Sequence, residues 1–480
     1  MSPRLLTRYA LLVIAAGLAV RAWLALSAMP IVYPDEHFQT LEPASRIVFG
    51  FGWKSWEWFE GVRSWVVPGL FMPVLAALKA FGIRGGPAAV SACRLWIAAW
   101  SAFGLWGFHR LLRDRGVSAG AHLFALGLLA LSPAMSVWSA ATFSESWALV
   151  FLWGLMPATL GALDSERPAH WMLAGAALGL TFTLRMQMAA WMPALGILLL
   201  STPRDRRILP ALSLGYLVPV VLQGLLDWLT WGHPFHSVRA NFYFNIVRGV
   251  ADANGRSPWH SYFRLAWDNL GPWLVGPMLA VVACAVACRR LRLRRQDKFI
   301  LAPALGFVVI HMAIGHKETR FILPAMPALF YLFAIALDGL GGRAAASGPL
   351  AKAIAAVAVL LAPGAAQLAQ DPDRFSPFDR SELCVAIHRD GGLRTNRRAV
   401  LLLVDSSWVW TRGELLFGGK VAYREVTPAR LGEADVSDCL YAIVPGDFEA
   451  TFQSRTGRSA AWRRLRADSH GNVLLKRDPR

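Results

Sequence analysis

Apolar runs of membrane-spanning length recur along this chain, and they constrain its fold more than any other feature. A helix that crosses the hydrocarbon core of a bilayer needs about 20 consecutive apolar residues. The runs predict eleven spans, at 8–29, 88–109, 119–138, 145–163, 171–184, 187–201, 208–230, 270–289, 299–315, 321–340 and 350–369. The spans at 171–184 and 187–201 are the weakest, because each is short for a bilayer. The chain is 55% hydrophobic and only 17% charged, which excludes an ordinary soluble globule.

Short clusters of Lys and Arg separate these runs and predict their orientation. With the N-terminus inside, because of Arg4 and Arg8, alternation places every basic loop on the inner side, in agreement with the positive-inside rule. These loops are 110–118, 164–170, 202–207, 290–298 and 341–349. Most of the net charge of +18 therefore serves topology, and no nucleic-acid partner is expected. A polybasic binding site at 289–298 is the alternative.

The predicted fold is an all-α polytopic membrane protein with a small C-terminal α/β domain outside the cytoplasm. The membrane domain covers 1–370 and includes a first outer loop at 30–87. Residues 371–480 follow the last span. They contain strand-like runs at Val400–Val404 and Leu440–Val444, broken by Gly, Pro and Asp. An odd number of spans places this domain outside.

Two adjacent carboxylates, Asp35 and Glu36, follow the first span in the sequence Tyr33-Pro-Asp-Glu-His-Phe-Gln39. Desolvation at a membrane surface can raise the pKa of a carboxylate toward the range of a general base. The alternative is a helix terminus, with Asp35 as the N-cap and Glu36 in the first turn.

Cations gather in the outer segment His316-Lys-Glu-Thr-Arg-Phe-Ile-Leu-Pro324. Arg suits bidentate contact with phosphate, and Lys supplies a point charge, so His316, Lys317 and Arg320 form a candidate phosphate clamp. The alternative is anchoring of the side chains at the membrane interface, which the positive-inside bias disfavours for an outer loop. Arg185 lies between the two weak spans, and an ionisable residue at membrane depth indicates a functional or a buried, paired group.

A third outer segment carries aromatic and amide side chains. It runs from Asp227-Trp-Leu-Thr-Trp-Gly232 through Asn241–Asn245 to Ser257-Pro-Trp-His-Ser-Tyr-Phe263. Such residues can bind a sugar ring, or they can form an aromatic belt at the bilayer surface.

Together these segments resemble glycosyltransferase family 22, the GT-C mannosyltransferases that include the Alg9-like and GPI mannosyltransferases. The matching residues are Pro34-Asp-Glu-His-Phe-Gln39, Phe49-Gly-Phe-Gly52, Trp56-Glu-Trp58, Arg63-Ser-Trp65, Pro68, Asp227, Trp231-Gly232, Phe244-Asn245, Ser257-Pro-Trp-His260, His316-Lys-Glu-Thr-Arg-Phe-Ile322 and Pro324. The combination occurs in the family's order across about residues 30–325 and is specific, whereas each motif alone is not.

The resemblance implies a polyprenyl-phosphate mannose donor, inverting transfer to a hydroxyl of a glycan or glycolipid, and no metal or other cofactor. By motif position, Asp35 is the general base, and Glu36 positions the acceptor or shares that role. His316, Lys317, Arg320 and Arg185 hold the lipid phosphate. His37, Gln39, Asn245, Trp259 and His260 are candidate contacts for the sugar or the acceptor. These groups are expected to meet in one pocket at the outer leaflet.

Other readings stay open at this point. A GT-C enzyme with another sugar or a protein acceptor fits the same residues. A transporter of lipid-linked sugars is less favoured, because we find no internal repeat and most charges lie in loops. The abundance of Ala, Arg and Leu indicates a bacterium with a GC-rich genome, so the inner membrane is the expected location, with the active site on its periplasmic face.

Overall fold

The computed structural model describes residues 1–27, 33–341, 356–357, 361–362, 381–391, 400–403, 413–417, 420–433, 435–456, 461–468 and 471–477. The chain forms two compact units. The first comprises 1–24, 60–67 and 97–370, and the second comprises 25–59, 68–96 and 371–480. Each unit is described by itself.

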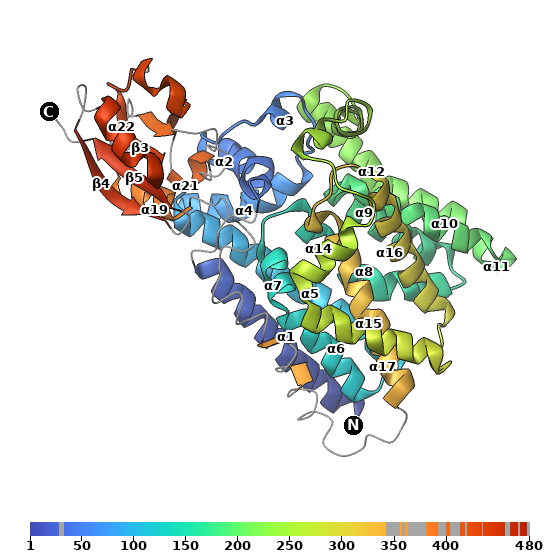
Figure 1. The fold of residues 1–480 in the computed structure, drawn as a ribbon. Helices are drawn as coiled ribbons and strands as arrows, with labels where there is room; N and C mark the ends of the chain where they lie inside the picture. The colour runs from blue at the N-terminus through green and yellow to red at the C-terminus, as the bar shows by residue number, and fades with distance from the viewer. Residues whose placement is uncertain are drawn as a thin grey trace. The chain divides into compact units, whose positions relative to one another are not determined.

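Apolar helices make the chain a multi-pass membrane protein. Six are long and apolar enough to span a bilayer: Pro3–Leu26, Pro87–Arg115, Ser144–Asp164, Pro203–Trp231, Arg295–Ala313 and Thr319–Gly341. In Figure 1 they contain α1 (Pro3–Leu26), α5 (Pro87–Arg115), α8 (Ser144–Asp164), α12 (Leu209–Trp231), α16 (Arg295–Ala313) and α17 (Met326–Gly341). The predicted all-α membrane architecture is confirmed.

Two further apolar segments each form a bent pair of helices, one over the predicted span 119–138 and one whose second helix covers the predicted span 270–289 while its first helix precedes that span. Helices α6 (Ala119–Leu131) and α7 (Pro133–Ala140) meet at 55°, and α14 (Ser261–Leu270) and α15 (Pro272–Ala287) meet at 116°. A proline begins the second helix of each pair, and its missing N–H and its clash with the preceding residue interrupt a continuous helix.

The predicted count of eleven spans is not confirmed. Counting each bent pair as one span brings the spanning helices of the described residues to eight. Shorter apolar helices cover Val66–Ala80, which is α4, and Met186–Leu200. The predicted span at 350–369 lies almost entirely outside the described residues.

Close helix packing in the first unit depends on small residues. Helix α9 (Pro168–Leu184) packs along α12. A Cβ atom added at Gly175 would collide with the carbonyl of Leu212, and one at Gly215 would collide with that of Met172. Small residues at such contacts let helix backbones approach, which is how membrane helices gain van der Waals contact. Elsewhere in this unit, α17 lies beside both α6 and α15 (Figure 1).

A buried ion pair joins three helices of the first unit. Both oxygens of Asp297 on α16 lie 2.9 Å from Nε of Arg115 on α5. The hydroxyl of Tyr331 on α17 donates to Asp297 Oδ1 at 2.8 Å, and the backbone N–H of Arg294 donates to Oδ2 at 2.6 Å. Both carboxylate oxygens are thus fully used, as a stable buried charge requires.

The remaining helices of the first unit are shorter. They are α10 (Met192–Leu200), α11 (Pro203–Arg206) and α13 (His236–Phe242), with 3-10 or π-helical turns at Met186–Trp191, Tyr243–Val247, Val250–Asn254 and Thr319–Ala325.

The second unit joins the first outer loop to the C-terminal segment. The loop forms a π-helical turn at Glu36–Leu41, then α2 (Glu42–Phe49), α3 (Trp56–Phe59) and α4. Glu42 accepts from the backbone N–H groups of Leu415 at 2.9 Å and Trp53 at 2.6 Å. In return, Glu414 accepts from the N–H of Gly52 at 2.7 Å. Hydrogen bonds to these two carboxylates therefore join α2 and the residues just after it to α21 (Gly413–Phe417).

The C-terminal segment contains a five-stranded mixed sheet in the order β2-β1-β3-β5-β4. Strand β1 (Val400–Leu403) is parallel to β2 (Ala422–Glu425) and β3 (Cys439–Pro445). Strand β5 (Asn472–Arg477) is antiparallel to β3 and β4 (Trp462–Ala467). Helices α19 (Ser381–Asp390) and α22 (Glu449–Thr456) accompany it (Figure 1). Both predicted strands are present, and the predicted small C-terminal α/β fold is confirmed.

Candidate functional site

Arg185 lies in the break between two short apolar helices. Helix α9 ends at Leu184, and Arg185 is extended, with φ −151° and ψ 111°, before the 3-10 turn Met186–Trp191 begins. The two weak spans of the sequence therefore mark a real interruption. The extended backbone delivers a guanidinium that is only 5% exposed into the interior of the unit.

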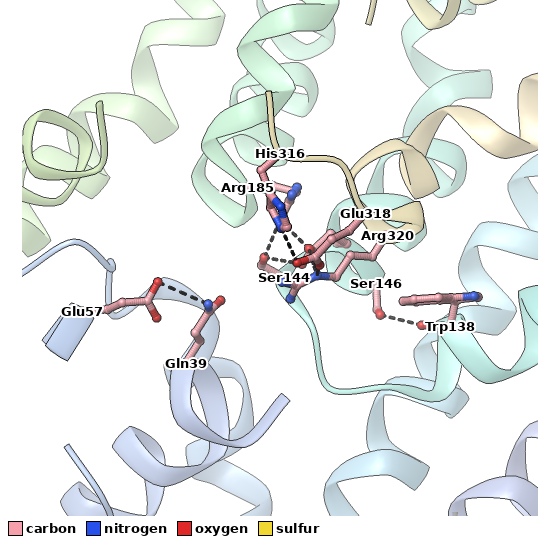
Figure 2. A network of polar contacts seen from close by, with 10 residues as sticks. Gln39, Glu57, Trp138, Ser144, Ser146, Arg185, His316, Glu318 and Arg320 are labelled. Atoms are coloured by element: carbon pink, nitrogen blue, oxygen red, sulfur yellow. Dashed lines mark hydrogen bonds and ion pairs between the residues drawn. The ribbon is translucent and has the colours of Figure 1, made fainter. Parts of the chain in front are cut away.

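Glu145, in the first turn of α8, is the partner of Arg185. Its Oε1 lies 2.7 Å from Arg185 Nη1 and 3.6 Å from Arg320 Nε, so one oxygen serves two arginines. Ser144 donates to Glu145 Oε2 at 2.7 Å and accepts from Arg185 Nη1 at 3.2 Å. Figure 2 shows Arg185, Ser144 and Arg320 converging from separate segments.

Glu318 forms a second carboxylate bridge beside the first. It pairs with Arg320 Nε, and its Oε1 lies 2.8 Å from His316 Nε2 (Figure 2). Burial alone would raise the pKa of Glu318, but the Arg320 charge and the hydrogen bonds from His316 and Arg320 hold it at about 2. The carboxylate of Glu318 is therefore ionised at any physiological pH.

The surroundings of His316 favour its charged form. Its Nε2 faces the Glu318 carboxylate, and its Nδ1 lies 3.0 Å from the carbonyl oxygen of Gly255. Both partners only accept hydrogen bonds, so the two contacts favour the imidazolium, which carries a proton on each ring nitrogen. The hydrogen bond to Glu318 raises the pKa of His316 accordingly.

Positive charge exceeds negative charge in this network. Arg185, Arg320 and His316 face the carboxylates of Glu145 and Glu318, and the charge of Arg63 also acts on Arg185. Among the residues that the structure describes, Arg185 Nε has no hydrogen-bond partner although it is buried. A buried donor without a partner costs about 1–3 kcal/mol, so the network is suited to receive an anion.

Lys317 points to backbone oxygens. Its Nζ donates to the carbonyl of Ser257 at 2.9 Å and also contacts that of Ile314. The backbone N–H of Ser257 returns a hydrogen bond to the carbonyl of Gly315 at 2.9 Å. Lys317 therefore holds the segment that leads to Trp259 and His260 in place. Its predicted contact with phosphate stays a prediction.

The predicted sugar or acceptor contacts of the first unit lie at its surface. Trp259 is 64% exposed and meets the exposed ring of His260 edge to face, with centroids 5.5 Å apart. Asn245 is half-buried in the π-helical turn Tyr243–Val247.

The two acidic residues of the first outer loop belong to the second unit and differ in environment. Glu36 is fully buried, and both its oxygens lie 3.1 Å from Arg94 Nη2. Asp35 is half-buried at the N-cap of the π-helical turn, where its side chain makes no capping hydrogen bond. The buried ion pair of Glu36 with Arg94 suits a structural role, and Asp35 stays the predicted base by its position in the motif.

The other candidates in that loop are also placed. His37 is fully buried, and Gln39 donates to Glu57 Oε1 at 3.3 Å (Figure 2). Because these residues and the arginines lie in different units, their predicted meeting in one pocket stays a prediction.

Sequence reasoning missed Glu145 and Ser144 and gave no role to Glu318. Glu145 opens a span on the predicted outer side, where a carboxylate is favourable in the first turn of any helix. The signal in the sequence was a carboxylate, Glu145, at the outer end of a span, together with two cations, Arg185 and Arg320, that had no predicted acidic partner. Among the described residues, no group of three His, Cys, Asp or Glu side chains has metal-binding geometry, and independence from metal stays a prediction.

Comparison with known proteins places this chain in a family. The model of the Alg9-like mannosyltransferase family matches residues 12–369. GPI mannosyltransferase 3 of Yarrowia lipolytica is 28% identical over 331 residues, which are 67% of this chain and 61% of that protein. GPI alpha-1,2-mannosyltransferase 3 of Danio rerio is 25% identical over 347 residues, 66% of this chain and 58% of that protein. The chain thus spans about three fifths of the length of these relatives.

The fold also has a solved counterpart. ArnT from Cupriavidus metallidurans, in a crystal structure bound to undecaprenyl phosphate, aligns with a TM-score of 0.62 over 98% of both chains. At 16% identity, this likeness concerns the fold. Since the family model covers most of the sequence, the chain belongs to the Alg9-like mannosyltransferase family.

Proposed function

We propose that this protein transfers mannose from a polyprenyl-phosphate mannose donor to a hydroxyl of a lipid-linked or envelope glycan. The observation that carries the proposal is the buried arginine pair, Arg185 and Arg320, on the single carboxylate oxygen of Glu145. Membership of a mannosyltransferase family supports mannose as the transferred sugar. The excess of positive charge around the arginines suits the phosphate of the lipid donor.

The arginine pair would act on the leaving group. As the bond between the sugar's anomeric carbon and the phosphate oxygen breaks, the lipid phosphate gains a negative charge. Preorganised donors aimed at such a developing charge typically contribute about 3–4 kcal/mol each. Glu145 and Glu318 keep the guanidinium groups in place before the donor arrives, so little reorganisation is needed during the reaction.

Asp35 would remove the proton of the acceptor hydroxyl, whose oxygen attacks the anomeric carbon from the face opposite the phosphate. The proton passes to the Asp35 carboxylate, the new glycosidic bond forms, and configuration inverts. The reaction needs no metal, because the arginines supply the positive charge. Glu36 is less suited to this role, since Arg94 pairs with it.

The expected setting is the periplasmic face of a bacterial inner membrane. An acceptor and a donor that both carry long lipids would reach the protein through the bilayer. Fusion of a reporter enzyme after residue 370 should give activity only outside the cytoplasm, as the predicted orientation requires.

The direct test is transfer by purified protein in liposomes that contain labelled polyprenyl-phosphate mannose and a glycolipid extract as acceptor. We expect a mannosylated lipid product with wild-type protein and, because the base is lost, less than a few per cent of that rate with Asp35→Asn. Asp268→Asn is the matched control, since its side chain is half exposed on α14, and it should keep full activity.

Each outcome decides one part of the proposal. Substantial turnover by Asp35→Asn would remove Asp35 from the role of base. Movement of the donor across the bilayer without any mannosylated product would identify a transporter and contradict the proposed activity.

A further inference from the structure

A second buried polar cluster lies in the first unit and has no role so far. Asp227, near the end of α12, is fully buried. Its Oδ2 accepts from both the backbone N–H of Ser237, at 2.9 Å, and the Ser237 hydroxyl, at 2.6 Å. The side chain of Ser64 also hydrogen-bonds to this carboxylate. Three separate segments therefore meet at Asp227.

Two helix faces bring amide groups to the same place. Gln223 and Asp227 are four residues apart on α12, and Ser237 and Asn241 are four residues apart on α13, so each pair lies on one helix face. The two faces meet, because Gln223 Nε2 lies 3.5 Å from Ser237 Oγ.

Several polar atoms of this cluster are unused. Within the described part of the chain, no hydrogen-bond partner exists for Asp227 Oδ1, Gln223 Oε1 or Asn241 Nδ2, and all three atoms are buried. The three side chains are at most 8% exposed. Leaving such groups unpaired costs about 1–3 kcal/mol each, so a protein rarely keeps several together without a use for them.

Helix capping explains only part of this arrangement. Asp227 caps the N-terminus of α13 through the N–H of Ser237, but that contact uses Oδ2, and Oδ1 has no partner among the described residues. Capping also gives no reason for the unpaired amide atoms of Gln223 and Asn241. A cluster that served structure alone would be expected to satisfy its own groups, as Asp297 does.

The chemistry of these atoms selects the ligand. Asp227 and Gln223 offer oxygens that accept, and Asn241 offers an N–H group that donates. A sugar hydroxyl both donates and accepts, so it can satisfy either kind of atom. A phosphate group only accepts, and the Asp227 carboxylate would repel it. The cluster therefore suits a neutral polyol.

The segment 60–67 connects this cluster to the phosphate network. Ser64 hydrogen-bonds to Asp227, while the charge of its neighbour Arg63 acts on Arg185. The adjacent residues Arg63 and Ser64 thus bring the two clusters to the same part of the first unit, which favours the donor hexose as the occupant of the Asp227 cluster. Because the unpaired atoms are buried, α13 has to shift for the sugar to reach them. The turn before α13 contains Gly232 and Phe235, both with positive φ, where such a movement can start.

We propose that Asp227, Gln223 and Asn241 form the subsite that binds hydroxyl groups of the donor hexose and thereby selects the sugar. The inference rests on the proposed mannosyl transfer. Asp227 accepts from a sugar hydroxyl through Oδ1, and the amides of Gln223 and Asn241 complete the contacts.

The test is a cycle of enzyme variants against donor variants. Polyprenyl-phosphate mannose is compared with its 2-, 3-, 4- and 6-deoxy analogues, using wild-type protein and Asp227→Asn. We expect wild-type kcat/KM to fall about 10–100-fold for at least one deoxy donor, since a hydrogen bond to a charged group is lost. In Asp227→Asn that penalty should shrink to about threefold or less, because the variant has already lost the contact.

Gln223→Met is the second variant, since it replaces an unpaired acceptor by an apolar side chain of similar length and should fold as well as wild type. It should also weaken discrimination between the donors. Asp268→Asn is the control and should keep all wild-type penalties.

The outcomes separate the two proposals. Wild-type protein that transfers mannose, with the same deoxy penalties in every variant, would overturn the sugar subsite alone and indicate that bound water fills the cluster. Wild-type protein that transfers no mannose at all would overturn the proposed function, and the subsite with it.

Discussion

Two buried ion networks lie in the first unit, around Asp297 and around Glu145. They differ in whether their charged and polar atoms all find partners within the network. Asp297 has both oxygens occupied by Arg115, Tyr331 and the N–H of Arg294. The Glu145 network instead shares one oxygen between Arg185 and Arg320, and none of the described residues hydrogen-bonds to Arg185 Nε. Both are buried, and both join segments far apart in the chain.

A structural network and a binding network can be told apart by this property. A closed network with balanced charge gains nothing from a ligand, and removing one member exposes a bare charge. An open network with excess charge gains energy when an anion arrives, and removing one arginine leaves each carboxylate with another partner. Glu145 would keep Arg185, and Glu318 would keep His316.

The largest effect is expected when the Asp297 network loses its carboxylate charge. Asp297→Asn leaves the Arg115 guanidinium without its counter-ion, and such a loss typically destabilises a protein by about 3–5 kcal/mol. Thermal unfolding in detergent, followed by intrinsic tryptophan fluorescence, should show a clearly lower transition temperature. A transition unchanged from wild type would mean that the Asp297 network does not hold the helices together.

A smaller effect, which depends on pH, is expected from the His316–Glu318 pair of the Glu145 network. The Glu318 hydrogen bond raises the pKa of His316 above its usual 6.5, so this pairing stabilises the protein fully below pH 6.5 and is lost as pH rises through the raised value. The pH profile of kcat/KM should therefore fall on its alkaline side as His316 deprotonates.

Glu318→Gln should move that fall to lower pH, because the neutral amide no longer favours the imidazolium. The variant has to be compared with wild type over the same buffers and ionic strength. An alkaline limb that stays in place would exclude His316 as the group that titrates.

Much of this fold was readable from the sequence because bilayers impose a simple rule on helix length and apolarity. Arg185 drew attention through two spans that were too short, and the structure has the chain extended there. The HKETR segment was likewise recognised by its cations. The strands around Val400 and Leu440 followed from their apolar runs.

What the sequence did not reveal depends on contacts between distant segments. Glu145 gave the pattern of an ordinary first-turn carboxylate, and only folding places it between Arg185 and Arg320. Lys317 is a residue type that commonly binds phosphate, yet its ammonium group donates to backbone carbonyl oxygens. No sequence pattern predicts these partners. The sharp bend between α14 and α15 similarly arises at Gly271-Pro272, inside what hydropathy suggested was the start of a single span.

The most direct test of the central claim is the affinity of purified protein for polyprenyl phosphate, the proposed product, in wild type and Arg320→Ala. We expect the variant to fold normally and to bind at least about tenfold more weakly, since a charge-assisted contact with phosphate is lost. Arg264→Ala, at an exposed position, should bind as wild type does. Equal affinity in wild type and Arg320→Ala would contradict the claim that this open network receives the lipid phosphate.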